Sequence, residues 1–423
     1  MTAPASDVSP VSTAIRHARL ATSAGFAAQG FVYAVLLTSL EGFKDRYGVD
    51  DGQITLVVLG VCVMAALGTL VADRVARSRG GSRVVLGAGL VIVAASVVVA
   101  AVAPGFALLA AGFAVYGVGL GMVDAGTNMQ AVAVQREYGR SLLTGFYASW
   151  SAGGIVGAVL VAVTTGRTPT DPVAVALLSG TLVAGLAAVW VLRSAWRGRG
   201  PAGVHADGVA RPDEALAVPV GAGEKPVVPW GAVLLLGLGV VAYYVADTAI
   251  STWSTIYLGD VLLAAASFAP LGYAAYLTTT LGSRLAGDPL VRRWGRVIVL
   301  RVAALVGAVG LVLVVAAPGP WVALAGFAVA GAGLGVIAPL CFSAAGALAP
   351  GHADAVVARL NIFNYVGAVL GGVLVGAIGS TSSLHYGFLV PIVLVVAVAV
   401  LAGRFGVTRE EGARATADSG AGA

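Results

Sequence analysis

The stretch that decides the fold occurs twice. Residues 111–121 read AGFAVYGVGLG and residues 325–335 read AGFAVAGAGLG, so two segments 214 positions apart differ at only two of eleven positions. Chance similarity between helices rich in Ala, Gly and Val is the simplest explanation of one such match. A second correspondence at nearly the same offset argues against it, because Asp73 and Asp288 are each followed by six residues and then Gly. We therefore expect two parallel structural repeats.

The composition indicates that these repeats fold in a membrane. Of the 423 residues, 58% are apolar and 11% are charged, whereas charged residues make up about a quarter of a soluble domain. A membrane-spanning helix needs roughly 20 apolar residues, so twelve spans would use about 240. Stretches such as Val84–Val102 are apolar on every face, which excludes the alternating pattern of a membrane β-barrel. The sequence predicts an all-α integral membrane protein without a large soluble catalytic domain.

The apolar runs predict twelve transmembrane helices in two pseudo-symmetric six-helix halves. Residues 1–193 form the first half, 194–228 a polar linker, and 229–423 the second half with a short tail. The expected helices are Ala18–Phe43, Gln53–Ala76, Ser82–Ala103, Phe106–Ala133, Leu142–Thr164, Pro172–Arg193, Pro229–Leu258, Leu262–Ala286, Val297–Ala316, Pro320–Leu348, Ala355–Ile378 and Ser383–Phe405.

The basic residues predict the orientation of these helices. Under the expected limits, one side of the membrane holds only Lys44, Arg46 and Arg167, and every other Lys and Arg falls on the opposite side. Short loops rich in Lys and Arg remain in the cytoplasm. We therefore expect a multi-pass protein of the plasma (inner) membrane with the linker and both termini cytoplasmic.

Several classes of function are disfavoured by what the sequence contains. Cys62 and Cys341 lie within apolar runs and suit packing, and the four histidines fall in loops or near helix ends. No clustered nucleophile, base or metal set is visible, so we expect no catalytic residues, no metal, no cofactor and no enzymatic activity. The net charge of +5 is explained by the cytoplasmic loops, so nucleic acid is not an expected partner.

The loops between the second and third helices and between the eighth and ninth share one pattern. Their acidic, basic and glycine residues are Gly68, Asp73, Arg74 and Arg77 in the first loop and Asp288, Arg292 and Arg293 in the second. With the two six-helix halves, this pattern resembles the major facilitator superfamily of secondary transporters. In that family the loops gate the alternation between states, although the spacing from Gly68 to Asp73 is one residue longer than usual. An Asp at such a place can cap a helix N-terminus or pair with an Arg that moves during the cycle.

A narrower resemblance is to the branch related to sugar (fucose-type) permeases. It rests on the segments DAGTNMQAVAVQ from Asp124, WSTIYL from Trp253 and SRLAGDPLVRRWG from Ser283. Two departures separate the chain from drug antiporters. Phe113 stands where proton-coupled exporters often have an intramembrane Arg, and the fifth helix lacks the Pro of the antiporter signature.

Two acidic residues lie away from the predicted helix ends and are candidates for proton coupling. Asp247 is near the middle of the seventh helix, where no Arg, Lys or His is expected at the same depth. An acid there can bind a proton or a substrate, or it can form a hydrogen bond that holds helices together. Asp124, in the fourth helix, can line the cavity or pair with a snorkelling Arg77 or Arg140.

Polar and aromatic residues at similar depth are candidates for the wall of a substrate cavity. Amides supply donors and acceptors and aromatic rings stack on a sugar face, although hydrogen bonding between helices is an equal alternative. The candidates are Gln29, Tyr33, Asn128, Tyr147, Trp150, Tyr243, Trp253, Asn361, Asn364 and Tyr365.

We therefore expect a secondary active transporter that rocks two halves around a central cavity. Its leading substrate is a small, polar, sugar-like solute taken up with protons, and we expect it to work as a monomer in the lipid bilayer. The alternatives are proton-coupled efflux of drugs or metabolites and, in a different class, a membrane receptor or scaffold without transport.

Overall fold

The computed structural model describes residues 12–39, 43, 46–49, 51–78, 80–164, 172–197, 230–265, 268, 271–348, 353–381 and 384–405. Secondary structure in these ranges is helical throughout. Lys44, Arg167 and most of the linker, on which several of the expectations above depend, lie outside the described residues.

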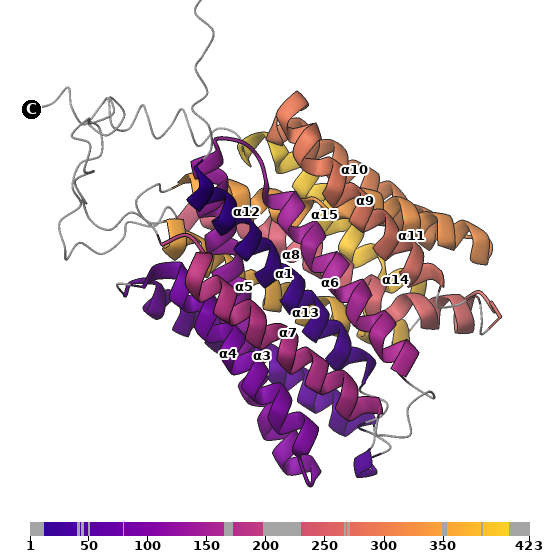
Figure 1. The fold of residues 1–423 in the computed structure, drawn as a ribbon. Coiled ribbons are helices and arrows are strands. Elements are labelled where there is room, and N and C mark those ends of the chain that lie inside the picture. The colour runs from indigo at the N-terminus through magenta and orange to yellow at the C-terminus, as the bar shows by residue number, and fades with distance from the viewer. Residues whose placement is uncertain are drawn as a thin grey trace, which may run out of the picture.

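The described residues form twelve long helical segments, six on either side of the linker, which confirms the expected all-α fold of two halves. The first half, indigo to magenta in Figure 1, contains α1 (Thr13–Thr38), α3 (Asp51–Ala76), α4 (Gly81–Val102), α5 (Phe106–Tyr138), α6 (Leu143–Thr164) and α7 (Pro172–Ser194). The second half, orange to yellow, contains α8 (Trp230–Ile256), α9 (Leu271–Trp294), α10 (Arg296–Val315), α11 (Pro320–Leu334), α12 (Ile337–Leu348), α13 (Ala353–Thr381), α14 (Leu384–Gly387) and α15 (Leu389–Leu401). The tenth span is α11 with α12, and the twelfth is α14 with α15, followed by a 3₁₀ turn at Ala402–Phe405.

The ends of the first and fourth spans follow from local capping. The side chain of Ser12 accepts a hydrogen bond from the amide of Ile15, so α1 begins at Thr13, before the expected start. Gly139 has a left-handed conformation with φ 62°, which ends α5 at Tyr138, later than Ala133. These shifts are small and leave the order of the spans unchanged.

The eighth span is the main correction to the expected boundaries. A π-helical turn at Tyr257–Val261 prolongs α8, and α9 occupies Leu271–Trp294 instead of Leu262–Ala286. The apolar run was expected to end the helix, but α9 continues through Arg284, Asp288, Pro289 and the two arginines near its end. Eleven helices in the described ranges are long and apolar enough to cross a membrane, and α9 with its charges is not among them.

The repeated glycines allow neighbouring helices to pack closely. A Cβ atom at Gly121 would collide with the carbonyl of Ala65 in α3, and one at Gly331 would collide with the carbonyl of Tyr276 in α9. These contacts confirm a packing role for the glycine motif. The same spacing in both halves therefore brings α5 against α3 and α11 against α9.

The halves meet mainly along two pairs of helices, α3 with α13 and α6 with α9, and α5 also contacts α12 and α13. We call the end of the bundle where α1 begins, α7 ends and α8 begins the linker end, and the opposite one the far end. The hydrogen bonds between the halves that are described below, all among the described residues, lie at mid-depth or toward the linker end. The bundle is thus closed at the linker end.

Candidate functional site

Asp124 of α5 lies at mid-depth and joins the two halves. One carboxylate oxygen accepts a hydrogen bond from the amide of Gln29 in α1, and the other accepts one from the hydroxyl of Tyr365 in α13. Pairing with Arg77 or Arg140, one of the expected alternatives, is therefore wrong in this conformation. Both oxygens of Asp124 are engaged, one from each half.

Asp247 of α8 has a different environment. Its Oδ1 accepts hydrogen bonds from the hydroxyls of Tyr276 in α9, at 2.7 Å, and Tyr243 in α8, at 3.3 Å. Its Oδ2 accepts none from any described residue, and the side chain is partly exposed. Of the two acids, Asp247 thus retains an oxygen that can bind a proton or a solute.

Arg284 of α9 is the functional residue that the sequence analysis missed. It is only 4% exposed and lies near mid-depth, about three turns before the end of α9. Its Nη2 donates to the hydroxyl of Tyr243 over 2.6 Å, which in turn contacts Asp247. The expectation that no basic residue shares the depth of Asp247 is therefore wrong, because Arg284 was placed near a helix end that in fact lies at Trp294.

The other contacts of Arg284 cross to the first half. Nη1 donates to the hydroxyl of Ser151 in α6 over 2.6 Å, and Nε donates to the carbonyl of Gly335 over 3.3 Å. The guanidinium carbon lies 5.6 Å from the ring centroid of Tyr147 and 5.7 Å from that of Trp150. These acceptors and rings satisfy a buried cation without a direct salt bridge.

A buried layer of amides surrounds these charges. The hydroxyl of Tyr147 donates to Asn128 over 2.9 Å, Asn361 donates to Thr69 over 3.2 Å, and Asn364 donates to Asn361 over 2.8 Å. All four of the candidates among them, Asn128, Tyr147, Asn361 and Asn364, are nearly inaccessible. In this conformation they hold helices together and lie behind the accessible surface.

An accessible aromatic layer extends toward the far end. Tyr33, near the end of α1, is 38% exposed, and its ring centroid lies 5.9 Å from that of Trp150. Trp253, near the end of α8, is partly exposed and donates to the carbonyl of Gly372, and Tyr273 in the first turn of α9 is also partly exposed. Their positions along the helices place these partly exposed aromatic side chains on the far-end side of Asp247.

The second of the two loops that share the acidic, basic and glycine pattern contacts the first half at the linker end. Asp288 of α9 is 6% exposed and accepts hydrogen bonds from the hydroxyl of Ser141 at 2.7 Å and from the amides of Thr144 at 3.3 Å and Gly145 at 2.9 Å. Arg292 donates to the carbonyl of Ser141 over 3.2 Å. An acid of the second half thus caps the N-terminus of α6 in the first half.

The first of the two loops with this pattern forms its contacts within its own helix. Asp73 forms an ion pair of 2.9 Å with Arg77 one turn later, and Arg74 donates to the carbonyl of Leu70. The other carboxylate oxygen of Asp73 is buried and has no hydrogen-bond partner among the described residues. Residues 349–352, which precede the start of α13, lie outside the described ranges.

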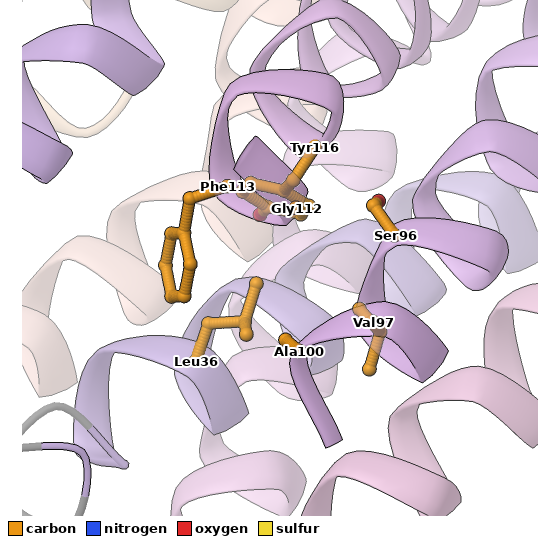
Figure 2. A pocket seen from close by; sticks show the side chains of 7 residues that line it. All are labelled: Leu36, Ser96, Val97, Ala100, Gly112, Phe113 and Tyr116. Atoms are coloured by element: carbon orange, nitrogen blue, oxygen red, sulfur yellow. The ribbon is translucent and has the colours of Figure 1, made fainter. Parts of the chain in front are cut away.

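Figure 2 shows a small recess of the first half, lined by Leu36, Ser96, Val97, Ala100, Gly112, Phe113 and Tyr116. It lies between α1, α4 and α5, and it has no room for a water molecule. Phe113 packs there edge-on against Tyr116, with 6.3 Å between ring centroids. The recess is a packing gap, and the charged and aromatic groups between the halves remain the candidate site.

Proteins related by sequence are described as transporters. An uncharacterised transporter y4wD of Sinorhizobium fredii is 29% identical over 280 residues, which are 66% of this chain and 69% of that protein. An uncharacterised MFS-type transporter of Yersinia pestis is 29% identical over 282 residues, covering 66% of this chain and 67% of the other.

Solved structures share the fold at low identity. FucP in the outward conformation has a TM-score of 0.75 at 14% identity and covers 92% of this chain and 98% of its own. The human organic anion transporter MFSD10 has a TM-score of 0.72 at 16% identity, covering 92% and 99%. The proton:xylose symporter XylE has a TM-score of 0.70 at 13% identity, covering 94% and 96%.

The family pattern covers almost the whole chain. The pattern of the Major Facilitator Superfamily matches residues 22–286 and 236–422, one match reaching across each half. Together with the two six-helix halves and the relatives described as transporters, this match shows that the chain belongs to the Major Facilitator Superfamily of membrane transporters.

Proposed function

We propose that this transporter takes up a small, polar, sugar-like solute together with protons, and that Asp247 is the proton-binding group. The observation that carries the proposal is the unequal engagement of the two central acids. Asp124 has a donor on each oxygen, whereas Oδ2 of Asp247 has none among the described residues. A carboxylate with a free, accessible oxygen can exchange a proton with water or a hydroxyl group.

The chemistry of the accessible layer supports a neutral, hydroxylated solute. Tyr33, Trp150 and Trp253 offer aromatic faces, and Ser151 offers a hydroxyl beside them. Aromatic rings stack on the apolar face of a sugar, while hydroxyls and carboxylates bind its hydroxyl groups. One guanidinium faces two carboxylates here, so an anionic solute would add a negative charge to a site that already has an excess of them.

The orientation belongs to the same proposal. Basic residues gather at the linker end, including Arg16, Arg74, Arg83 and Arg140, and basic loops stay in the cytoplasm. With the linker end cytoplasmic and closed, the conformation described here faces outward. We place the transporter in the plasma membrane, acting as a monomer.

Proton movement driven by a solute tests the proposal directly. Purified protein is placed in liposomes that contain a pH-sensitive dye, and neutral pentoses and hexoses are added outside without a pH gradient. Acidification of the lumen by a sugar is the expected result. Lipophilic cations are tested as a second set of solutes. Proton movement with these cations and not with sugars would favour the efflux alternative. No proton movement with any sugar or cation would overturn coupled transport.

A further inference from the structure

The partners of Arg284 are divided between the two halves of the protein. Tyr243 and Gly335 belong to the second half, as does Arg284 itself. Ser151 and the rings of Tyr147 and Trp150 belong to α6 in the first half. The guanidinium therefore keeps this set of contacts only while α6 and α9 lie together.

Opening the linker end requires these two helices to part. Asp288 of α9 caps the first turn of α6, and this contact lies one turn beyond Arg284 along α9. Movement of one half against the other must break the cap, because the two helices belong to different halves. The same movement draws Ser151 and the aromatic pair away from Arg284.

A buried guanidinium that loses an acceptor needs another one. A charged donor left without a partner in a protein interior is strongly unfavourable. Within the second half only one hydroxyl group separates Arg284 from the carboxylate of Asp247: the Tyr243 hydroxyl lies 2.6 Å from Nη2 and 3.3 Å from Oδ1. Oδ2 of Asp247 is free to accept the guanidinium directly.

We propose that Arg284 is a positioning residue that couples opening of the linker end to the release of a proton from Asp247. While the linker end is closed, α6 holds the guanidinium and Asp247 can keep its proton. Once α6 leaves, Arg284 pairs with the carboxylate, the O–H bond of Asp247 breaks, and the proton passes to water entering from the linker end. This inference rests on the proposed function, because it takes Asp247 as the proton-binding group.

The coupling has a definite sign. The state with an open linker end binds one proton fewer at Asp247, so a rise in pH must favour it. A site that exchanges one proton shifts such an equilibrium by at most about tenfold per pH unit. The shift needs no solute, so it can be measured before the substrate is known.

Other ionisable groups around Asp247 and Arg284 must be separated from them. They are Tyr243 and Tyr244 on α8, Tyr273 and Tyr276 on α9, Tyr33 on α1, Tyr147 on α6, Tyr365 on α13 and Asp124 on α5. Tyrosine titrates near pH 10, so Asp124 is the other described group at this depth that can respond between about pH 5 and 8. Asp354 at the linker end can respond as well.

The experiment measures the linker-end distance in the whole protein. Cys62 and Cys341 are replaced, and spin labels are attached at Arg140 in the first half and Arg301 in α10, both exposed near the linker end. Distance distributions by double electron–electron resonance in nanodiscs give the open fraction from about pH 5 to about pH 8. In the protein with Arg284 unchanged, the ratio of the open to the closed population should rise at least about threefold per pH unit.

The variants give separate outcomes. Arg284→Gln removes the charge and should abolish the pH response at Asp247, whereas Arg284→Lys should restore part of it. Asp247→Asn should lose the same response, and any pH response that remains comes from other groups, such as Asp124 and Asp354. A full response in Arg284→Gln, with none in Asp247→Asn, would overturn the role of Arg284 and leave the proposed function intact. A full response in Asp247→Asn would instead remove Asp247 as the proton-binding group.

Ser151 provides a test from the other half, with a matched control on the same helix. Ser151→Ala removes an acceptor that Arg284 has only in the closed state, so the open fraction should rise several-fold at every pH while the pH response is kept. Ser149→Ala removes only a bond to the carbonyl of Gly145 within α6 and should change nothing. Equal behaviour of the two variants would contradict the proposal.

Discussion

Asn361 of α13 donates a hydrogen bond to Thr69 of α3 across the boundary between the halves, and the internal repeat relates this pair to Tyr147 and Arg284. Asn361 lies 214 positions after Tyr147, and Arg284 lies 215 positions after Thr69, the offset that also relates Asp73 to Asp288. Both interfaces thus follow one plan, but only the contact of α6 with α9 carries a charge at this position. The predictions below concern this asymmetry and the two halves that it joins.

The first prediction concerns Asp247. Asp247→Asn keeps the size of the side chain and imitates its protonated form, so it should abolish gradient-driven accumulation and retain solute exchange across a membrane without a gradient. Transport of the identified solute into liposomes, with and without a pH gradient, measures both. Asp260→Asn, an exposed change in the turn after α8, is the control. Accumulation at the unmodified level in Asp247→Asn would shift the proton site to Asp124.

The second prediction distinguishes Asp124 from Asp247. Both oxygens of Asp124 accept hydrogen bonds, one from Gln29 and one from Tyr365. Asn can accept on one atom only, so Asp124→Asn should lower the free energy of unfolding by about 1–3 kcal/mol while proton coupling persists. Thermal unfolding in detergent and the dye assay measure the two effects. Loss of coupling in a variant as stable as the parent would contradict the structural role.

The third prediction concerns the cap that closes the linker end. Asp288→Asn replaces a charged acceptor by a neutral one at the N-terminus of α6. A partly buried charge at a helix terminus contributes up to about 2 kcal/mol, and about 1.4 kcal/mol corresponds to a factor of ten. The open fraction in the spin-label experiment should therefore rise roughly tenfold.

Asp73→Asn is the matched comparison for this cap. The ion pair of Asp73 with Arg77 lies within α3 and does not join the halves. This variant should leave the open fraction closer to that of the unmodified protein, while exchange between the states slows and ligand affinity is kept. A larger shift for Asp73→Asn than for Asp288→Asn would reverse the assignment of the two loops.

The fourth prediction concerns the independence of the halves. Residues 194–228 are rich in Gly, Ala, Pro and charges and have no sustained apolar period, which suits a tether between separately packed units. Co-expressed fragments 1–205 and 215–423 should therefore recover part of the transport. Normal insertion of both fragments without any transport would show that the linker has a further role.

The fifth prediction concerns orientation. Reporters fused after Ala423 or inserted near Gly208 should lie in the cytoplasm, and one at Asp51 should lie outside, because short basic loops stay in the cytoplasm. An alkaline phosphatase and fluorescent protein pair reads out both sides. A cytoplasmic signal at Asp51 would mean that the linker end lies outside, so the conformation described here would face the cytoplasm.

The number and order of the helices could be predicted because each span except the eighth is a long apolar run. That span fails the rule, since α9 carries Arg284, Asp288, Arg292 and Arg293. The hydropathy pattern therefore predicted too early an end for this helix, so Arg284 was expected near a helix end although it lies at mid-depth. The repeat itself contained the missing signal: Arg284 precedes Asp288 as Thr69 precedes Asp73, and Thr69 was already expected inside a helix.

The central acids were recognised from the sequence, but their unequal surroundings were not. Tyr365 lies 241 positions from Asp124, and Tyr276 lies on a helix whose limits were wrong. Which hydroxyl reaches which carboxylate depends on how the halves dock, and one sequence does not encode that docking in any local pattern. The buried amides Asn361 and Asn364 were likewise identified as polar, yet their depth behind the cavity follows only from the packing of α13.

The closure at the linker end is made largely with main-chain atoms. The amides of Thr144 and Gly145 donate to Asp288 across the boundary, and within the first half those of Leu142 and Leu143 donate to Gln135 and hold the same segment in place. Since every residue except proline carries such an amide, these hydrogen bonds do not depend on which side chains stand at positions 142–144. Those side chains are constrained by their burial instead. Gly145 is constrained as well, because a Cβ there would approach Asp288 to 3.2 Å. A proline at position 144 or 145 would remove one of the amide donors to Asp288, which no other substitution can do.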